Sequence, residues 1–188
     1  QRAADPDNRL LTHQNHRRLD AEAIRDTILF VSGDLDLKQH DQTVRPGTKS
    51  EYGYEFKNNY RSVYIPVFRN RLHELLAVFD FPDPNLSVGR RNTSTLSTQA
   101  LYLMNNPFVM QQAEQIARRV NHDYPADQSA RIDALFRIML GRLPYATEKA
   151  NAERFLELSQ TKTASEQIEA WTAFCQTMIA CIDFRYIQ

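Results

Sequence analysis

Hydrophobic residues recur every three or four positions over most of the second half of the chain, the spacing that places side chains on one face of a helix. This pattern predicts helices near residues 107–121, 128–140, 147–159 and 165–182. Shorter stretches with the same spacing predict helices near 16–32, 70–79 and 97–105. Asn106 and Pro107 should begin the 107–121 helix as its N-cap and its first residue. We therefore expect a mainly α fold, an irregular multi-helix bundle.

Three stretches lack this pattern and predict irregular structure. Residues 1–14 are polar and predict a surface arm, and residues 34–60 predict a long loop. Residues 79–97 predict a central loop, because Pro82 and Pro84 fix their own backbone and remove two donors. Beyond it, threonine and serine side chains between Thr95 and Thr98 are good N-caps for the next helix.

Residues 61–68 (RSVYIPVF) are the best candidate for a strand. They are rich in β-branched and aromatic side chains, which fit a pleated sheet. Pro66 cannot donate a ladder hydrogen bond and excludes this segment from the centre of a sheet. The fold should therefore contain at most a short strand or hairpin near 61–68. The helix near 70–79 should begin with Asn70 as its cap.

Large apolar side chains of several predicted helices should share one core: Leu103, Leu135, Phe136, Phe155, Trp171 and Phe174. In the helix near 147–159, Ala150, Phe155, Leu156 and Leu158 are expected to face inward. The aromatic residues of the long loop allow two interpretations: Tyr52, Tyr54, Phe56 and Tyr60. They either attach the loop to the helices or form a surface for sugars or a partner. The sequence favours attachment.

The composition excludes several classes of protein. The 188 residues suit one helical domain spanning 1–188, with 23 basic and 23 acidic side chains. A net charge of zero argues against a general nucleic-acid or membrane-surface binder. No apolar run is long enough for a membrane span, and no signal peptide is visible. Because the chain begins at Gln1 without Met, we expect it to be a piece excised from a larger protein.

Cysteine and histidine give no metal or haem motif. Cys175 and Cys181 lie about 9 Å apart along one predicted helix, too far for a disulfide, so buried free thiols are expected. There is no CxxCH and no zinc-type cysteine pair. His13 and His16 could share a helix face and bind a metal, but the sequence offers no third ligand nearby. Solvated histidines are favoured, so no metal site is predicted.

The central loop holds the residues that most resemble a site. Arg90 and Arg91, followed by Asn92 and Thr93, would bind an anion, helped by the N-terminus of the next helix. Asp80 and Asp83 would act as an acid/base pair or as structural partners of the arginines. The structural interpretation is favoured for at least one arginine, whose loss should then cost a few kcal/mol. Arg17 and Arg18 are expected at a solvated helix start, because acidic residues follow them.

A family resemblance rests on five segments of the chain: NHRRLDAEAIRDTILFVSGDLDL, YRSVYIPVFRN, ELLAVFDFPDPNLSVGRRNTSTLSTQALYLMNNPFVMQQA, LFRIMLGRLP and WTAFCQTMIACIDFRYI. Together they resemble the C-terminal domain of unknown function of large planctomycete exported proteins, which often also carry cytochrome-c-like domains. The resemblance implies an exported setting, periplasmic or at the cell surface, and a preceding domain in the same polypeptide. It implies no catalytic residues and no cofactor in this chain, with haem carried elsewhere in the parent protein.

Two function classes follow. The first is a non-catalytic structural or interaction module that scaffolds redox or polysaccharide-processing domains. The second is a site on the 79–98 loop that binds an anion or a sulfated glycan, or hydrolyses one. The sequence favours the first, with the preceding domain as partner and polysaccharide as a further one. It predicts neither nucleic-acid binding nor a membrane span.

Overall fold

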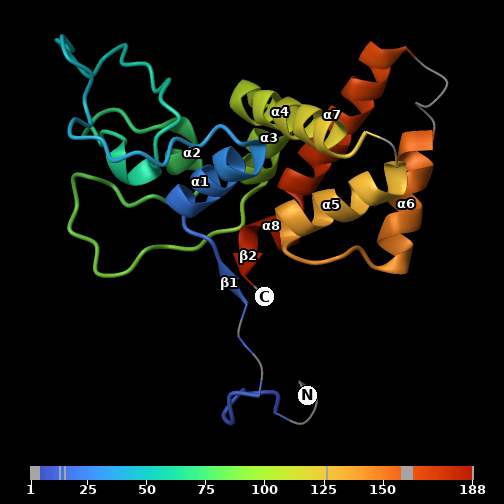
Figure 1. Cartoon of the computed structure of the whole chain (residues 1–188). Helices are drawn as coiled ribbons and strands as arrows, with labels where there is room; N and C mark the ends of the chain where they lie inside the picture. The colour runs from blue at the N-terminus through green and yellow to red at the C-terminus, as the bar shows by residue number, and fades with distance from the viewer. Residues whose placement is uncertain (1–4, 13, 15, 126, 158–162, 188) are drawn as a thin grey trace.

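The computed structural model describes residues 5–12, 14, 16–125, 127–157 and 163–187. Over this part the chain is mainly helical, which confirms the predicted fold class (Figure 1). The two longest helices are α4 (Pro107–Asp123) and α7 (Ala164–Ala180), and they pack against each other over the largest contact in the fold. Two further helices, α1 (Ala21–Ser32) and α3 (Ser97–Asn105), pack on this pair.

Shorter elements complete the bundle. α5 (Gln128–Leu140) and α6 (Ala146–Glu157) pack together on one side, and α2 (Glu74–Val78) lies against α1 on the other. After α7 the chain turns at Cys181 into α8 (Ile182–Arg185). Two short antiparallel strands then join distant parts of the chain: β1 (Arg17–Arg18) and β2 (Tyr186–Ile187). In Figure 1 the N-terminal arm extends from β1 away from the helices.

The predicted corner between α3 and α4 is confirmed. The side chain of Asn106 accepts a hydrogen bond from the backbone N–H of Phe108 at 2.9 Å, and Pro107 is the first helical residue. Proline suits this position because its missing N–H would have no helical partner there. The bounds of α3 and α5 are also as predicted, while residues 158 and 159 of the predicted 147–159 helix lie outside the described residues.

Two helix starts and one N-cap differ from the prediction. α1 begins at Ala21 rather than near residue 16, because residues 17–18 pair with β2 instead. α2 begins at Glu74 rather than at residue 70, and its N-cap is His73, not Asn70. α3 has Leu96 as its N-cap, with no side-chain cap. The nearby hydroxyl of Ser94 is instead bonded to a carboxylate in the central loop.

Residues 61–68 form no strand. Ser62–Tyr64 is a single 3₁₀ turn, η1, and residues 65–68 after it are in no strand. The reason lies on α1, where one carboxylate oxygen of Asp26 accepts hydrogen bonds from the backbone N–H (2.8 Å) and hydroxyl (2.6 Å) of Ser62. These bonds hold the segment against a helix and coil it locally.

The core contains most of the predicted side chains, with one error. Four are buried and Phe174 is partly buried against them: Leu103, Leu135, Phe136 and Trp171. Phe155 is 45% exposed, so its assignment to the core was wrong. In α6 the buried positions are Ala152 and Leu156, four residues apart on one face. Ala150 is exposed, and Leu158 lies outside the described residues.

The long 34–60 loop is attached to α1 by a buried charge. Arg25 is 1% exposed, and its guanidinium donates to the carbonyl oxygens of Asn58 at 2.6 Å and Tyr60 at 2.8 Å. Burial lowers the pKa of Arg25 to about 10, so it is still charged at neutral pH. These two carbonyl groups would otherwise have no partner in this irregular segment.

Aromatic residues of the same loop pack on one another and on α2. The ring of Tyr54 lies 5.1 Å from that of Phe56, and Phe56 lies 5.3 Å from His73. Tyr60 stacks on His40 with a centroid separation of 3.4 Å. Tyr52 is exposed. Phe56 therefore attaches the loop to α2, as the favoured interpretation predicted, whereas Tyr60 packs on a residue of the same loop.

We expect Trp171→Ala to lower the free energy of unfolding by roughly 3–5 kcal/mol, because it removes a large buried side chain. Phe155→Ala is the matched control and should cost below about 1 kcal/mol, since half of that ring already contacts water. Urea denaturation of both variants measures the difference. Equal losses would contradict the packing described above.

Acid should weaken the fold through His73. Its Nδ1 accepts a hydrogen bond from Leu75 N at 3.2 Å, and burial, with Arg25 nearby, lowers its pKa from 6.5 to about 4. The unfolded chain then binds more protons between these values, so stability is complete above pH 6.5 and falls toward pH 4. The loss should be on the order of 3 kcal/mol. His73→Asn keeps a good N-cap without this titration, so its denaturation midpoint should fall less over the same pH range.

Candidate functional site

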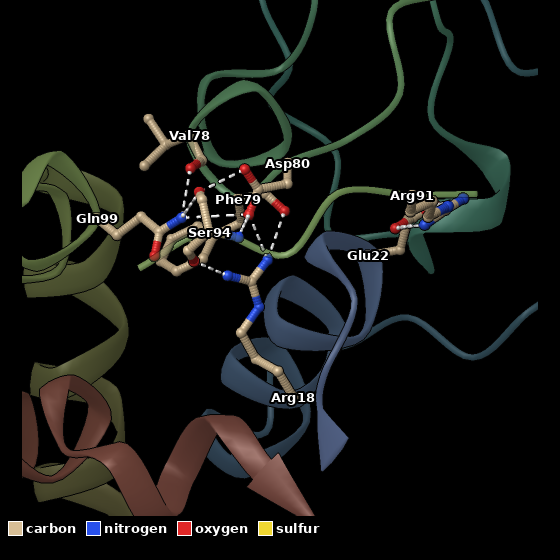
Figure 2. A network of polar contacts seen from close by, with 8 residues as sticks. All are labelled: Arg18, Glu22, Val78, Phe79, Asp80, Arg91, Ser94 and Gln99. Atoms are coloured by element: carbon tan, nitrogen blue, oxygen red, sulfur yellow. Dashed lines mark hydrogen bonds and ion pairs between the residues drawn. The ribbon is translucent and has the colours of Figure 1, made fainter. Parts of the chain in front are cut away.

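The central loop reverses direction at Asp80, whose φ of 63° lies in the left-handed region. Its carboxylate accepts hydrogen bonds from the guanidinium of Arg18 at 2.5 Å, and from the backbone N–H (2.9 Å) and hydroxyl (2.6 Å) of Ser94. The amide of Gln99 lies 3.4 Å from the same carboxylate. Figure 2 shows these groups converging on Asp80 from β1, the far end of the loop and α3.

Arg18 holds both ends of this loop. Besides Asp80, its guanidinium donates to the carbonyl oxygens of Phe79 and Ser94, on either side of the loop (Figure 2). The Arg18 side chain is only 5% exposed, so the expected solvated helix start was wrong for this residue. Successive residues of a strand point to opposite sides. In β1 this places Arg18 inward and leaves Arg17, with a side chain 74% exposed, outside.

These contacts decide the charge state of Asp80. Burial alone would raise its pKa, but the hydrogen bonds from Ser94 and the charge of Arg18 outweigh burial and hold the pKa below its usual value. Asp80 is therefore an anion at neutral pH, with both oxygens already accepting hydrogen bonds. Such a carboxylate is well suited to fixing a loop and poorly suited to exchanging a proton with a substrate.

Arg91 is also paired, through a more exposed contact. Its guanidinium makes two hydrogen bonds to Glu22 of α1, at 2.7 and 2.8 Å (Figure 2), and lies 5.5 Å from the ring centre of Phe81. The hydrogen bonds to Glu22 raise the pKa of Arg91. The two side chains are 42% and 26% exposed, so water screens this pair.

Asp83 does not join Asp80. One of its carboxylate oxygens accepts from the backbone N–H and side-chain amide of Asn85, at 2.8 and 3.0 Å. This is a local turn on the exposed side of the loop. The two aspartates therefore have separate partners.

Beside this network lies an open depression, which we call the arginine hollow. It has a volume of about 690 Å³ and is lined by residues of β1, the central loop and β2: His16, Arg17, Arg18, Asp20, Arg90, Arg91, Asn92, Thr93 and Tyr186. It contains all four predicted anion-binding residues. The sequence pattern gave no signal of the contribution of Arg17 and Tyr186, because the pairing of β1 with β2 brings them to the central loop.

A second depression is apolar and was not predicted. It has a volume of about 540 Å³, lies between α5, α6, α7 and α8, and is lined chiefly by apolar side chains that include Phe136, Phe155 and Phe174. The exposed position of Phe155 helps to create it. The sequence placed this ring in the core, so it gave no signal of a surface groove.

The structure shows no metal-binding cluster of histidine, cysteine or acidic residues in its described part; His13 lies outside it. Cys175 and Cys181 are free thiols, as predicted, and burial raises the pKa of both. Among the described helices, none is long and apolar enough to cross a membrane.

Arg18→Ala should lower the free energy of unfolding by about 3–5 kcal/mol, because it leaves a mostly buried carboxylate without its cation. Arg91→Ala should cost at most about 1 kcal/mol, less than the sequence predicted, since Glu22 remains in contact with water. Urea denaturation compares the two variants. Combining Arg18→Ala with Asp80→Asn should cost less than the sum of the single losses. Additive losses would show that the two residues do not interact.

The comparisons with known proteins place the chain in a family without giving it an activity. The model of the family described as PSD1, Protein of unknown function (DUF1553), matches residues 1–156. This range includes the central loop, β1 and α1. Helices α7 and α8 follow the matched region. Comparison with curated proteins and with solved structures found no match. With most of its length matched, the chain belongs to the PSD1 family of proteins of unknown function (DUF1553).

Proposed function

We propose that this chain is a non-catalytic helical module that provides structure and an interaction surface in an exported multidomain protein. The observation that carries this proposal is the bonding of the central loop. Asp80 is satisfied by Arg18, Ser94 and Gln99, and Arg91 by Glu22. Asp80 and Arg91, two of the side chains that looked most like an active site, therefore hold the loop against β1, α1 and α3.

The N-terminal arm offers a surface for a partner. Leu10 and Leu11 are 78% and 84% exposed, and the arm holds them in place through Asp5. The carboxylate of Asp5 accepts from the backbone N–H groups of Arg9 and Leu10, both at 2.9 Å. Leu11 has a φ of 52°, a strained value for a bulky residue. Two adjacent leucines held in water by a strained turn favour a contact with another part of the parent protein.

The partner proposed for this surface is the preceding domain of the same polypeptide. In that arrangement the module scaffolds neighbouring redox or polysaccharide-processing domains, in the periplasm or at the cell surface. Haem would be bound by those other domains. The family resemblance supports this setting, and the exposed leucines support the contact itself.

Hydrogen exchange tests the contact. Backbone amides of residues 9–12 should exchange more slowly in the intact parent polypeptide than in this 188-residue chain. The double substitution Leu10→Ser and Leu11→Ser should abolish that protection. It should change the stability of the chain alone by no more than about 0.5 kcal/mol. Leu37→Ser, at a similarly exposed leucine of the long loop, is the control. Identical exchange in the parent and in the chain alone would refute the contact.

A second candidate function is favoured by the arginine hollow. The sequence offered, as an alternative, a site on the 79–98 loop that binds or hydrolyses an anion or a sulfated glycan. The hollow favours binding, because Arg90, Asn92 and Thr93 all line it. The hydrolytic form has less support. Its proposed acid or base, Asp80, accepts several hydrogen bonds within the fold, and Asp83 is bonded in its own turn.

A further inference from the structure

The four arginines of the arginine hollow form two groups with different roles: Arg18 and Arg91 hold the structure, and Arg17 and Arg90 face solvent. Arg18 is bonded to Asp80 and Arg91 to Glu22, each at 2.7 Å or less. Their charge is largely neutralised by these carboxylates, and moving them would break the contacts that hold the central loop. They set the shape of the hollow and contribute little free charge to it.

Arg17 and Arg90 are the available cations. Arg17 forms an exposed ion pair with Asp20, in which the two charged atoms are 3.8 Å apart, beyond hydrogen-bond distance, so water screens it. In the described part of the chain, Arg90 forms no ion pair, and its side chain is exposed. The two come from different segments, β1 and the central loop, yet line the same depression. An anion entering the hollow would therefore meet two guanidinium groups that are free to reorient.

The size and the uncharged lining residues of the hollow limit which class of ligand it can bind. A volume of about 690 Å³ is that of a pocket for a small organic molecule, far above what a single sulfate or phosphate ion fills. The neutral lining offers the amide of Asn92, the hydroxyl of Thr93 and the ring of Tyr186. Amides and hydroxyls exchange hydrogen bonds with hydroxyl-rich ligands, and a tyrosine ring offers both an apolar face and a polar tip.

We propose that the arginine hollow binds an acidic oligosaccharide, with Arg17 and Arg90 each contacting a different sulfate or carboxylate group of the same molecule. Asn92 and Thr93 bind its hydroxyl groups, and Tyr186 lies against a sugar ring. Arg18 and Arg91 act as positioning residues. This inference rests on the second candidate function, anion binding, and adds to it the ligand class and the two residues that bind it.

Calorimetric titration of the full chain at fixed ionic strength tests the proposal with four probes. They are a sulfated disaccharide, its unsulfated counterpart, a disaccharide of uronic acids and sodium sulfate. The two acidic disaccharides identify sulfate or carboxylate as the better group. At least one should bind about tenfold more tightly than sodium sulfate, since it can engage both arginines with charge-assisted hydrogen bonds. The unsulfated neutral disaccharide should bind more weakly than both acidic disaccharides.

Arg17→Gln and Arg90→Gln should each weaken binding of the acidic disaccharide by about tenfold, while melting temperatures stay close to that of the unmodified chain. Arg61→Gln makes the same change of charge at an exposed arginine outside the hollow and should leave binding unchanged. Binding that weakens equally in all three variants would reflect net charge alone and would overturn the assignment.

The remaining outcomes separate the two levels of the proposal. Equal affinity for sulfate and for the acidic disaccharides, lost on substitution of Arg90, would keep anion binding and overturn the oligosaccharide. No binding by any probe would overturn both. A single-stranded oligonucleotide that binds more tightly than either acidic disaccharide would assign the hollow to another ligand class and would also overturn the inference.

Discussion

The arrangement of the first half of this protein depends on the ion pair between Arg18 and Asp80. The guanidinium is 5% exposed and the carboxylate 15%, so neither charge is well solvated and each requires the other. Because Arg18 also bonds to carbonyl groups at both ends of the central loop, one side chain fixes the loop, β1 and the start of α3 relative to one another. A hydrophobic contact would not specify these directions, since apolar burial is non-directional.

Helix α1 also fixes irregular segments through polar contacts, and its two faces have different roles. Its apolar face, with Ile24 and Ile28, is completely buried in the core. Its polar side chains hold irregular segments: Glu22 binds Arg91, Arg25 binds the end of the long loop, and Asp26 binds Ser62. Polar contacts of both loops thus lead back to one helix and the residue pair before it. Charged residues on a helix surface usually contact solvent. Here they bond to the irregular segments and hold them in place, as the ladder of a regular sheet would.

The sequence predicted the helices well because their apolar spacing is a local property. α3 and α5 have the predicted bounds, and the corner at Asn106 and Pro107 follows from capping chemistry alone. The failures involve contacts between distant residues. Arg18 meets Asp80 across 62 positions, and the pairing of β1 with β2 joins the two ends of the chain. Phe155 was misplaced because its spacing fits two adjacent faces of α6. The candidate anion-binding residues line one hollow, and the ion pair of Arg91 with Glu22, distant in sequence, could not be predicted.

The division of the arginines follows from the alternation of side chains in β1 and from the position of α1. In β1, Arg18 points inward to Asp80 and Arg17 lies in water. Glu22 binds Arg91, and within the described residues no carboxylate forms an ion pair with Arg90. Each structural ion pair thus lies next in sequence to an available cation. A surface built in this way keeps its shape when a ligand arrives, because the residues that would bind the ligand are not the ones that hold the loop. In the proposed binding mode, stability and recognition would therefore use neighbouring arginines without competing for the same charge.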